Sequence, residues 1–519
     1  MGHRVMILPG DARPADAVRS AWAAKEAEAL ATARVVVVGL GTSGLAALRA
    51  LDGRVGALGA TDGREAALEP AAEAAPRATL TAGDGPDALA EATLAMEPDV
   101  LVVSPGVPAT SPLMRRASAA GIPVWSEIEL AWRLQRPRPD GGYAPWLAIT
   151  GTNGKTTTVT MTEAILRQAG LDAIAVGNVG TPPVELVTAD GAGPDVLPAE
   201  LSSFQLHSTT SLAPLAAVCL NLAPDHLDWH GGYEAYRADK ARVYRGTTGL
   251  CVYSEADAAT RRMVEEADVA DGARAVGLTL DPPAVSQVGV VEGILAERVG
   301  TDRWTSAVEL GQVSDLAHLV SPTATADDVP DHLLLDALAA ATLARAAGVE
   351  PVHVRDALRA YSPGAHRSAL VRTVDGVRYV DDSKATNAHA ASAALAGYGS
   401  GQVVWIAGGL AKGASFDDLV REHADRLDRV VLIGRDRAPM LDALRRHAPL
   451  IPVIEVTRDD DEGVMDRAVE LAARAARPGQ TVLLAPASAS MDQFRSYAHR
   501  GDAFADAVRS LTGNGGEPA

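Results

Sequence analysis

Short apolar runs and longer amphipathic stretches alternate along most of this chain. Most of the apolar runs end close to Gly or Pro, and helical patterns rich in Ala and Leu connect them. This alternation predicts parallel strands joined by helices, and therefore an α/β protein with more than one parallel sheet. Strands are expected at Arg34–Val38, Asp99–Val103, Trp146–Ile149, Ala216–Leu222, Val403–Ala407, Val430–Gly434 and Thr481–Leu484.

Clusters of Pro and Gly divide the chain into three predicted domains. The run Arg136–Gly142 is the clearest linker, and a second cluster lies at Tyr361–Gly364. We therefore predict an N-terminal domain over 1–140, a central domain over 141–363 and a C-terminal domain over 364–519. The length of 519 residues agrees with about three domains at roughly 150 residues each. The Pro-punctuated stretch 280–330 gives no clear prediction.

A glycine turn follows the predicted strand at Trp146 and precedes a helix expected from Lys155 to about Ala169. In this arrangement the backbone N–H groups of the turn point at phosphate oxygens, Lys155 reaches the β- and γ-phosphates, and the Thr156 hydroxyl reaches Mg²⁺. The spacing is irregular, because Ile149 stands five residues before Gly154. We predict a nucleoside triphosphate site, and an ordinary strand-to-helix turn is the alternative.

A second glycine motif, G-x-G-x-x-G, follows the first predicted strand at Gly39, Gly41 and Gly44. Asp62 lies near the distance along the chain at which an acid contacts a ribose. Taken alone, the motif predicts a dinucleotide site, so a nicotinamide-dependent dehydrogenase is a competing hypothesis. That hypothesis gives no role to Lys155.

Other polar clusters also follow predicted strands. Glu200 and His226 are candidate ligands of a hard cation, although Asp225 and Asp228 could simply cap a loop beside His226. Lys240 lies on the amphipathic helix predicted over Tyr233–Tyr244, and its position in the pattern predicts a solvated side chain.

The last predicted domain has three polar clusters. Tyr379–Asn387 combines acids, a lysine and hydroxyl groups, and Ser488, Ser490 and Asp492 follow the last strand. Lys384 could bind a carboxylate, and Asp382 could accept a hydrogen bond from a ribose or an amine. A serine-rich helix cap is the alternative for the second cluster, and a turn with a surface lysine is the alternative for Gly408–Gly413.

Composition narrows the function classes. Aromatic residues make up only 4% of the chain, so the core must consist mainly of Ala, Val and Leu. The net charge of −19 argues against general binding to nucleic acid or acidic membranes, which requires basic surface. Two cysteines, Cys219 and Cys251, fit a reducing compartment. No stretch reaches the roughly 18 apolar residues of a membrane span, so we expect a soluble, cytoplasmic protein.

Six motifs in the same order along the chain resemble those of the Mur ligase family. They are Thr150–Thr157 (TGTNGKTT), Glu200–Leu206 (ELSSFQL), Asp225-His226, His366-Arg367, Asp382–Asn387 (DSKATN) and Ser488–Phe494 (SASMDQF). The resemblance runs from about Val35 to Phe504, and its last two motifs point to the members that add D-glutamate. It implies a Rossmann-like N-terminal domain for a UDP group, a central P-loop-type ATPase domain with a parallel sheet, and a C-terminal Rossmann-like domain for the amino acid and ATP.

The resemblance also implies an activity. The expected enzyme is an ATP-dependent amide ligase that joins D-glutamate to UDP-N-acetylmuramoyl-L-alanine through an acyl phosphate, in the synthesis of peptidoglycan precursors. It implies two Mg²⁺ ions and an N6-carboxylated Lys240 in place of the solvated lysine, and we expect a monomer. A sibling ligase with another acceptor amino acid is the alternative.

Residue by residue, the resemblance assigns five sets. The catalytic set is Lys155, Glu200, His226 and Lys240, and the metal ligands are Thr156, Glu200, His226 and Lys240. ATP is expected at Gly151, Thr152, Asn153, Gly154, Lys155, Thr156, Thr157, Arg367, Asp382 and Asp336, the last of which stands in a run, His332–Asp336, where relatives commonly carry asparagines. The UDP-substrate is expected at Gly39, Gly41, Thr42, Ser43, Gly44, Asp62, Gly63, Arg64, Ser104, Pro105, Gly106 and Asn178. D-glutamate is expected at Lys384, Thr386, Lys412, Ser490 and Tyr497, where Tyr497 replaces a common Phe.

Overall fold

A computed structural model describes residues 25–189, 191, 193–300, 305–320, 324–362, 364, 369–411, 414–456 and 463–512. The described chain forms two compact units. The first comprises Met1–Leu316 with Leu333–Tyr361, and the second comprises Ala317–His332 with Ser362–Ala519. The first unit holds two of the three sheets, and the predicted boundary near residue 140 lies inside it. The three domain ranges therefore remain a prediction, whereas the three-sheet α/β architecture is confirmed.

The first sheet has five parallel strands in the order β3-β2-β1-β4-β5. Val35 and Val37 of β1 face a core shared with α2, while Val36 and Val38 face α4 and α5. Because the strand order reverses between β1 and β4, a crevice is expected at the carboxyl ends of these two strands. The elements are β1 Arg34–Val38, α2 Thr42–Leu51, β2 Ala57–Asp62, α3 Leu68–Ala74, β3 Thr79–Ala82, α4 Pro86–Leu94, β4 Val100–Val103, α5 Pro112–Ala119, β5 Val124–Trp125 and α6 Glu127–Leu134.

The second sheet has nine strands in the order β14-β13-β12-β11-β10-β9-β6-β8-β7. Its strands from β7 to β12 pair in parallel, and β12, β13 and β14 form an antiparallel extension. The strands are β6 Trp146–Thr150, β7 Val176–Gly177, β8 Leu197–Glu200, β9 Ala216–Cys219, β10 Leu250–Ser254, β11 Arg274–Leu278, β12 Gln287–Val291, β13 Ile294–Glu297 and β14 Val308–Gln312. The helices are α7 Lys155–Gln168, α8 Pro183–Thr188, α9 Ser203–His207, α10 Leu227–His230, α11 Tyr233–Ala241, α12 Ala258–Glu265, α13 Asp331–Ala346 and α14 Pro351–Ala360.

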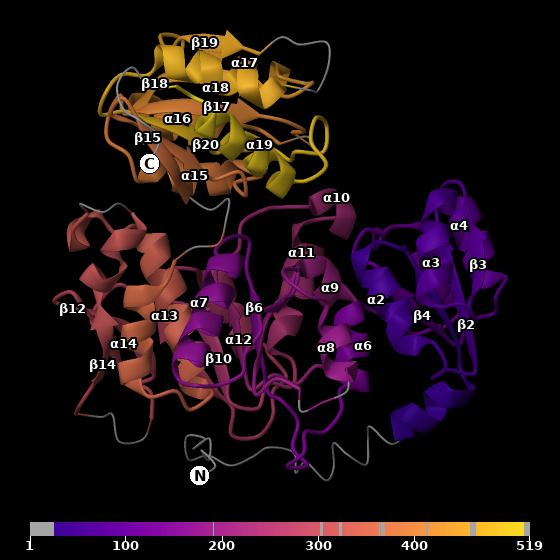
Figure 1. Ribbon diagram of the computed structural model, residues 1–519. Coiled ribbons are helices and arrows are strands. Elements are labelled where there is room, and N and C mark those ends of the chain that lie inside the picture. Colours follow the sequence, from indigo (N-terminus) through magenta and orange to yellow (C-terminus); the bar gives the residue numbers. More distant parts are fainter. Residues whose placement is uncertain are drawn as a thin grey trace. The chain divides into compact units, whose positions relative to one another are not determined.

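The third sheet lies in the second unit and has the order β15-β16-β20-β17-β18-β19 (Figure 1, orange to yellow). Alternate residues of β17 face opposite sides: Trp405 packs in the core with α15, α16 and α17, whereas Ile406 packs with α18 and α19. The strands are β15 Ala369–Val374, β16 Val377–Asp381, β17 Val403–Gly408, β18 Leu427–Ile433, β19 Val453–Glu455 and β20 Thr481–Leu484. The helices are α15 Ala388–Ala396, α16 Asp417–His423, α17 Ala438–His447, α18 Val464–Ala475 and α19 Tyr497–Arg509.

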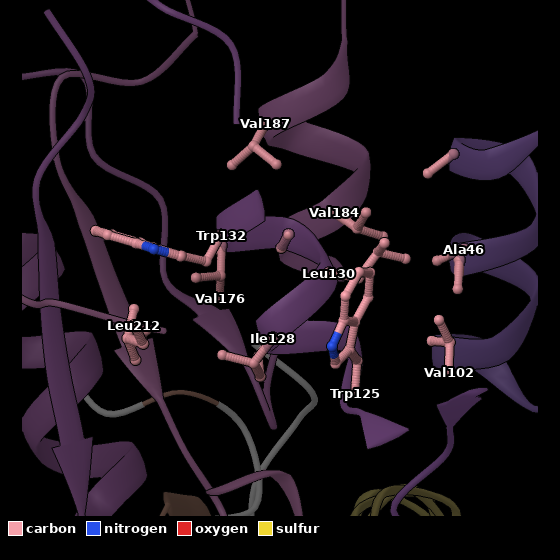
Figure 2. Packing of buried hydrophobic residues seen from close by; sticks show 14 of the residues in the cluster. Ala46, Val102, Trp125, Ile128, Leu130, Trp132, Val176, Val184, Val187 and Leu212 are labelled. Atoms are coloured by element: carbon pink, nitrogen blue, oxygen red, sulfur yellow. The ribbon is translucent and has the colours of Figure 1, made fainter. Parts of the chain in front are cut away.

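Helix α6 packs between the first and second sheets of the first unit. Figure 2 shows Leu130 of α6 beside Val184 of α8, and Ala46 on the facing helix α2. Ionisable groups also hold α6, because the buried carboxylate of Glu129 accepts hydrogen bonds from the backbone N–H groups of Thr210 and Ser211, at 2.8 and 2.9 Å. Apolar packing and hydrogen bonds therefore both hold α6 at this joint between the first and second sheets.

The stretch 280–330, whose pattern predicts no clear structure, contains the antiparallel strands β12 to β14. Their alternation is short and irregular, and a bulge interrupts the pairing between Leu295 and Ala296. A two-residue turn at Asp375-Gly376, with φ of 49° and 77°, joins β15 to β16 as the predicted strand pair requires. Among the described residues, no helix combines the length and hydropathy of a membrane span.

Candidate active site

The phosphate loop lies between the end of β6 and the start of α7. Gly154 has a left-handed backbone, with φ of 80°, and a Cβ atom there would stand 2.2 Å from the Asp336 carboxylate. The left-handed backbone favours glycine, since another residue would be strained there, and a Cβ atom would also force the Asp336 side chain to move. Asp336, on α13, therefore lies against the loop. Its proposed contact with adenine stays a prediction.

Hydrogen bonds within the chain hold the loop in shape. The Lys155 ammonium donates to the carbonyl oxygens of Gly151 and Thr152, both at 2.9 Å. Asn221, just after β9, accepts from the Asn153 N–H through its side chain, at 2.9 Å, and from the Thr152 N–H through its backbone, at 3.0 Å. These hydrogen bonds fix the shape of the loop, and Lys155 folds over it.

Glu200 ends the neighbouring strand β8 and is buried. One carboxylate oxygen accepts a hydrogen bond from the Thr156 hydroxyl, and the other accepts from the Asn178 side-chain amide, at 2.8 Å. The sequence predicted Thr156 and Glu200 as metal ligands and Asn178 as a substrate contact. The structure brings all three together.

A carboxylate and a hydroxyl at hydrogen-bonding distance are hard oxygen donors of the kind that Mg²⁺ prefers. Within the part of the chain that the structure describes, no three His, Cys, Asp or Glu side chains are grouped to hold a metal ion. Such a group is not required here, because Mg²⁺ in nucleotide sites commonly takes one or two protein oxygens together with phosphates and water. Thr156 and Glu200 therefore fit one magnesium ion.

Lys240 is buried on α11, with 2% of its surface exposed, so the solvated side chain predicted from periodicity is wrong. Its ammonium donates to the Gly151 carbonyl oxygen at 2.7 Å and lies 3.4 Å from the Thr150 hydroxyl. Burial, followed by the nearby charge of Lys155, lowers the pKa of Lys240 from 10.5 to about 7. The prediction from the helical periodicity failed because α11, next to the phosphate loop, buries polar side chains such as Asp239 and Lys240.

His226 has a different setting. It precedes α10 with a left-handed backbone, φ 51°, and its ring lies 4.9 Å from the ring of Phe204. Its Nε2 atom is 3.6 Å from the Asp225 carboxylate, and the side chain is 44% exposed. These contacts do not test whether His226 binds a second metal ion, so that role stays a prediction.

The glycine loop after β1 requires its first and third glycines. Gly39 has φ of 84°, and a Cβ atom at Gly44 would stand 2.0 Å from the Gly39 carbonyl oxygen. The Ser104 hydroxyl, after β4, donates to this same carbonyl at 2.5 Å. Around Gly41 the space is open, as the close approach of a ligand requires. The loop and the turn after β4 thus meet at the predicted crevice.

Asp62 shapes this region through bonds to the backbone. Its carboxylate accepts from the N–H groups of Leu40, at 2.7 Å, and Arg64, at 2.8 Å. Burial alone would raise the pKa of Asp62, but these bonds and the Arg64 guanidinium lower it. The remaining predicted contacts of the UDP-substrate lie close by in the chain, at Thr42, Ser43, Gly63, Pro105 and Gly106.

In the second unit, the predicted amino-acid residues lie on two loops and the start of α19. The Lys384 ammonium lies 3.9 Å from the centre of the Tyr497 ring, a cation–π contact. Thr386 follows on the same loop, Ser490 is buried on the loop after β20, and the Asp382 N–H donates to Leu484 at 2.8 Å. Arg367 and Lys412 lie outside the described residues.

Two residues at the phosphate loop had no clear signal in the sequence. Asn221 fixes the loop, as described above, and the Tyr236 hydroxyl lies 3.0 Å from the Thr152 hydroxyl. Tyr236 also places its ring 5.0 Å from the Lys240 ammonium. Asn221 lies in the predicted strand Ala216–Leu222 and Tyr236 lies in the predicted helix Tyr233–Tyr244. The sequence pattern does not distinguish either side chain from its neighbours.

Three family models match this chain. They are described as "Mur ligase MurD-like, N-terminal domain" for residues 33–126, "Mur ligase middle domain" for 149–286 and "Mur ligase, glutamate ligase domain" for 366–488.

Curated relatives are similar over almost their whole length. The UDP-N-acetylmuramoylalanine–D-glutamate ligase of Streptomyces coelicolor is 54% identical, with 92% of this chain and 98% of the relative covered. The protein of the same name from Thermobifida fusca is 49% identical, with 92% and 99% covered.

Solved structures are similar in fold. UDP-N-acetylmuramate-alanine ligase MurC of Thermotoga maritima has a TM-score of 0.51 at 16% identity, covering 92% of this chain and 99% of that one. FolC of E. coli has a TM-score of 0.51 at 18% identity, covering 74% and 93%.

Proposed function

Because the chain belongs to the Mur ligase family, we propose that it is the ATP-dependent ligase that joins D-glutamate to UDP-N-acetylmuramoyl-L-alanine. The reaction belongs to the cytoplasmic synthesis of peptidoglycan precursors. Relatives with this name share about half of their residues with the chain. The observation that carries the proposal is the group at the phosphate loop, in which Thr156 and Asn178 both donate to the buried carboxylate of Glu200.

The chemistry explains why such a loop is needed. A carboxylate and an amine do not condense in water, because the carboxylate oxygen is a very poor leaving group. Transfer of the γ-phosphoryl group of ATP to the alanyl carboxylate makes an acyl phosphate, and attack by the amine of D-glutamate then expels phosphate and forms the amide bond. The energetic difficulty lies in bringing two anions together, and fixed positive charge in the loop offsets it.

Several residues have roles in this scheme. The Lys155 ammonium leaves the carbonyl oxygens of Gly151 and Thr152 and neutralises the transferred phosphoryl group. Thr156 and Glu200 would hold the first magnesium ion, which would supply positive charge at the phosphate oxygens when bound. Asn178 orients Glu200 and is proposed to contact the muramoyl substrate.

We further propose that Lys240 carries an N6-carboxyl group and, with His226, serves a second magnesium ion. A lysine reacts with carbon dioxide only as the neutral amine, releasing one proton as the carbamate forms. The pKa of about 7 supports this, since burial keeps a large share of the Lys240 amine neutral near pH 7. Lys384, Thr386, Lys412, Ser490 and Tyr497 are proposed to bind D-glutamate.

Phosphate release tests the proposal. The enzyme is assayed with ATP, magnesium and UDP-N-acetylmuramoyl-L-alanine against a panel of D- and L-amino acids. We expect release to depend on D-glutamate. Release with another amino acid but not with D-glutamate would identify a sibling ligase instead.

A dehydrogenase is the competing class, and thermal shift separates it from the ligase. We expect stabilisation by UDP-N-acetylmuramoyl-L-alanine. A large shift with NAD and none with the UDP-sugar would contradict the ligase.

A further inference from the structure

Helix α19 carries a fully buried arginine in the second unit. Arg500 has 0% of its surface exposed and is among the largest fully buried side chains of the described chain. Removing a guanidinium from water is strongly unfavourable unless hydrogen bonds replace the lost hydration. A buried arginine therefore marks a place where its hydrogen bonds are needed.

The guanidinium joins two loops. It donates to the Ser383 hydroxyl at 2.9 Å and to the Ser383 carbonyl oxygen at 2.8 Å, and it donates to the Ser488 carbonyl oxygen at 3.0 Å. Ser383 belongs to the loop after β16, Asp382–Asn387, and Ser488 belongs to the loop after β20, 485–496. We call these two segments the acceptor loops.

The first acceptor loop is also tied to the start of α19. The Ser383 hydroxyl donates to the Tyr497 carbonyl oxygen at 2.8 Å, and the Ser383 N–H donates to Asp381 at 2.9 Å. Ser383 is itself fully buried. Arg500 and Ser383 together therefore connect both acceptor loops to one helix.

Residues proposed to bind the acceptor amino acid lie directly beside these bonds. Lys384 follows Ser383, Ser490 lies two residues after Ser488, and Tyr497 precedes Arg500 by about one helical turn. Lys384 also packs over the Tyr497 ring, at 3.9 Å from its centre. Any shift of one loop against the other would therefore move these groups apart.

We propose that Arg500 is a positioning residue that holds the two acceptor loops at the separation needed to bind the acceptor amino acid. This inference rests on the proposed function, because it takes Lys384, Ser490 and Tyr497 as the groups that bind the acceptor. Arg500 itself touches no substrate, since its guanidinium is enclosed by the protein. Its rigid planar fork suits the task, because one side chain reaches oxygens of both loops.

The charge of Arg500 is retained at neutral pH. Burial lowers the pKa of Arg500 to about 10, and the charges of Asp492 and Asp381 oppose this decrease. The guanidinium therefore stays protonated, and all of its N–H groups remain donors. Lysine at this position would keep a positive charge but would lose the fork that spans both loops.

The experiment compares Arg500→Lys and Arg500→Met with Phe504→Leu. Phe504 lies one turn further along α19 and is equally buried, but it packs in the apolar core and its side chain donates no hydrogen bond to either acceptor loop. Steady-state KM is measured for the acceptor, for ATP and for the UDP-sugar. Hydrogen exchange is followed in peptides that cover 382–387 and 485–496.

In Arg500→Lys we expect the KM for the acceptor to rise roughly ten- to hundredfold, the range expected for misplaced binding groups, and the KM for the UDP-sugar to stay unchanged. The KM for ATP should rise less than that for the acceptor, because only one of its predicted contacts, Asp382, lies in an acceptor loop. Both acceptor loops should exchange faster in the two Arg500 variants. Phe504→Leu should lower thermal stability and leave the acceptor KM and the loop exchange unchanged. If Arg500→Met fails to fold, Arg500→Lys decides.

Wild-type exchange rates in the loops of Arg500→Lys would overturn the inference, and so would an unchanged acceptor KM in that variant. Failure of the proposed function looks different. In that case the wild-type enzyme releases no phosphate with D-glutamate, whereas the exchange measurement still reports whether Arg500 joins the loops.

Discussion

Glu127 is a buried carboxylate at the joint between the first and second sheets. It has 2% of its surface exposed, and its Oε1 atom accepts the Val184 N–H at 2.8 Å. Burial raises the pKa of Glu127 from 4.5 to about 7, against the effect of the Val184 bond, and the charge of Glu185 raises it further. The folded protein therefore keeps a proton here that the unfolded chain releases.

The direction of the pH dependence follows from this difference. Between pH 4.5 and about 7 the folded state binds a proton at Glu127 and the unfolded state does not, so the free energy of unfolding falls as the pH rises. Above about pH 7 both states are ionised and the loss is complete. At about 1.4 kcal/mol per pH unit, the window corresponds to a loss of about 3 kcal/mol.

Glu127→Gln removes the titration and keeps an oxygen for the Val184 N–H. We expect the variant to be more stable than the wild type by up to about 3 kcal/mol at pH 8, with the difference vanishing towards pH 4.5. The chain has two compact units, so unfolding in denaturant is followed by hydrogen exchange in peptides of α6 and α8. This measurement reports on the first unit alone.

Glu65→Gln is the matched control, because Glu65 is exposed on the same unit and its substitution should leave the stability unchanged at both pH values. The reasoning is refuted if Glu127→Gln changes stability equally at pH 5 and pH 8. It is also refuted if the variant is the less stable protein at pH 8.

Three other substitutions test the sites. Lys155→Ala should lower phosphate release at least about a hundredfold, because it removes the cation at the loop; normal turnover would contradict the assignment. Lys240→Ala should be inactive in the same assay and regain part of its activity with short carboxylates such as acetate, whereas full activity without them would exclude a carboxylated lysine. Glu129→Ala leaves the donors of Arg133, Thr210 and Ser211 without their carboxylate, so the unfolding free energy of the first unit should fall by about 3–5 kcal/mol. Denaturation followed by exchange measures this, and a change within about 0.5 kcal/mol would be typical of an ordinary surface site.

Local sequence predicted the elements whose residues carry their own signal. The strand at Trp146 and the helix from Lys155 follow from an apolar run and a glycine turn, and the structure confirms them as β6 and α7. The third glycine of the G-x-G-x-x-G motif, Gly44, is also part of the predicted pattern, and its close approach to Gly39 explains it. These signals are local, so a single sequence contains them.

Contacts between segments that are far apart in the sequence could not be predicted from local patterns. Lys240 looks like a surface residue of an amphipathic helix, and only the tertiary fold brings it to the Gly151 carbonyl. Arg500 gives no signal either, because an arginine in a helix is usually exposed. The resemblance names Lys240 as a site candidate, but it does not predict the contact with Gly151 that buries the side chain.

The Gly151 carbonyl oxygen accepts a hydrogen bond from both Lys155 and Lys240. The carbonyl oxygens of the loop thus bind the Lys155 ammonium, and an anion that binds here must compete with them for Lys155. A weakly charged anion gains little from this exchange, because Lys155 gives up its hydrogen bonds to the carbonyl oxygens for equivalent bonds to the anion. A triphosphate gains more, since it also engages the backbone N–H groups of the turn. The loop can therefore discriminate by charge density as well as by shape, which suggests that inhibitors without a polyanionic group should bind beside Lys155 rather than displace it.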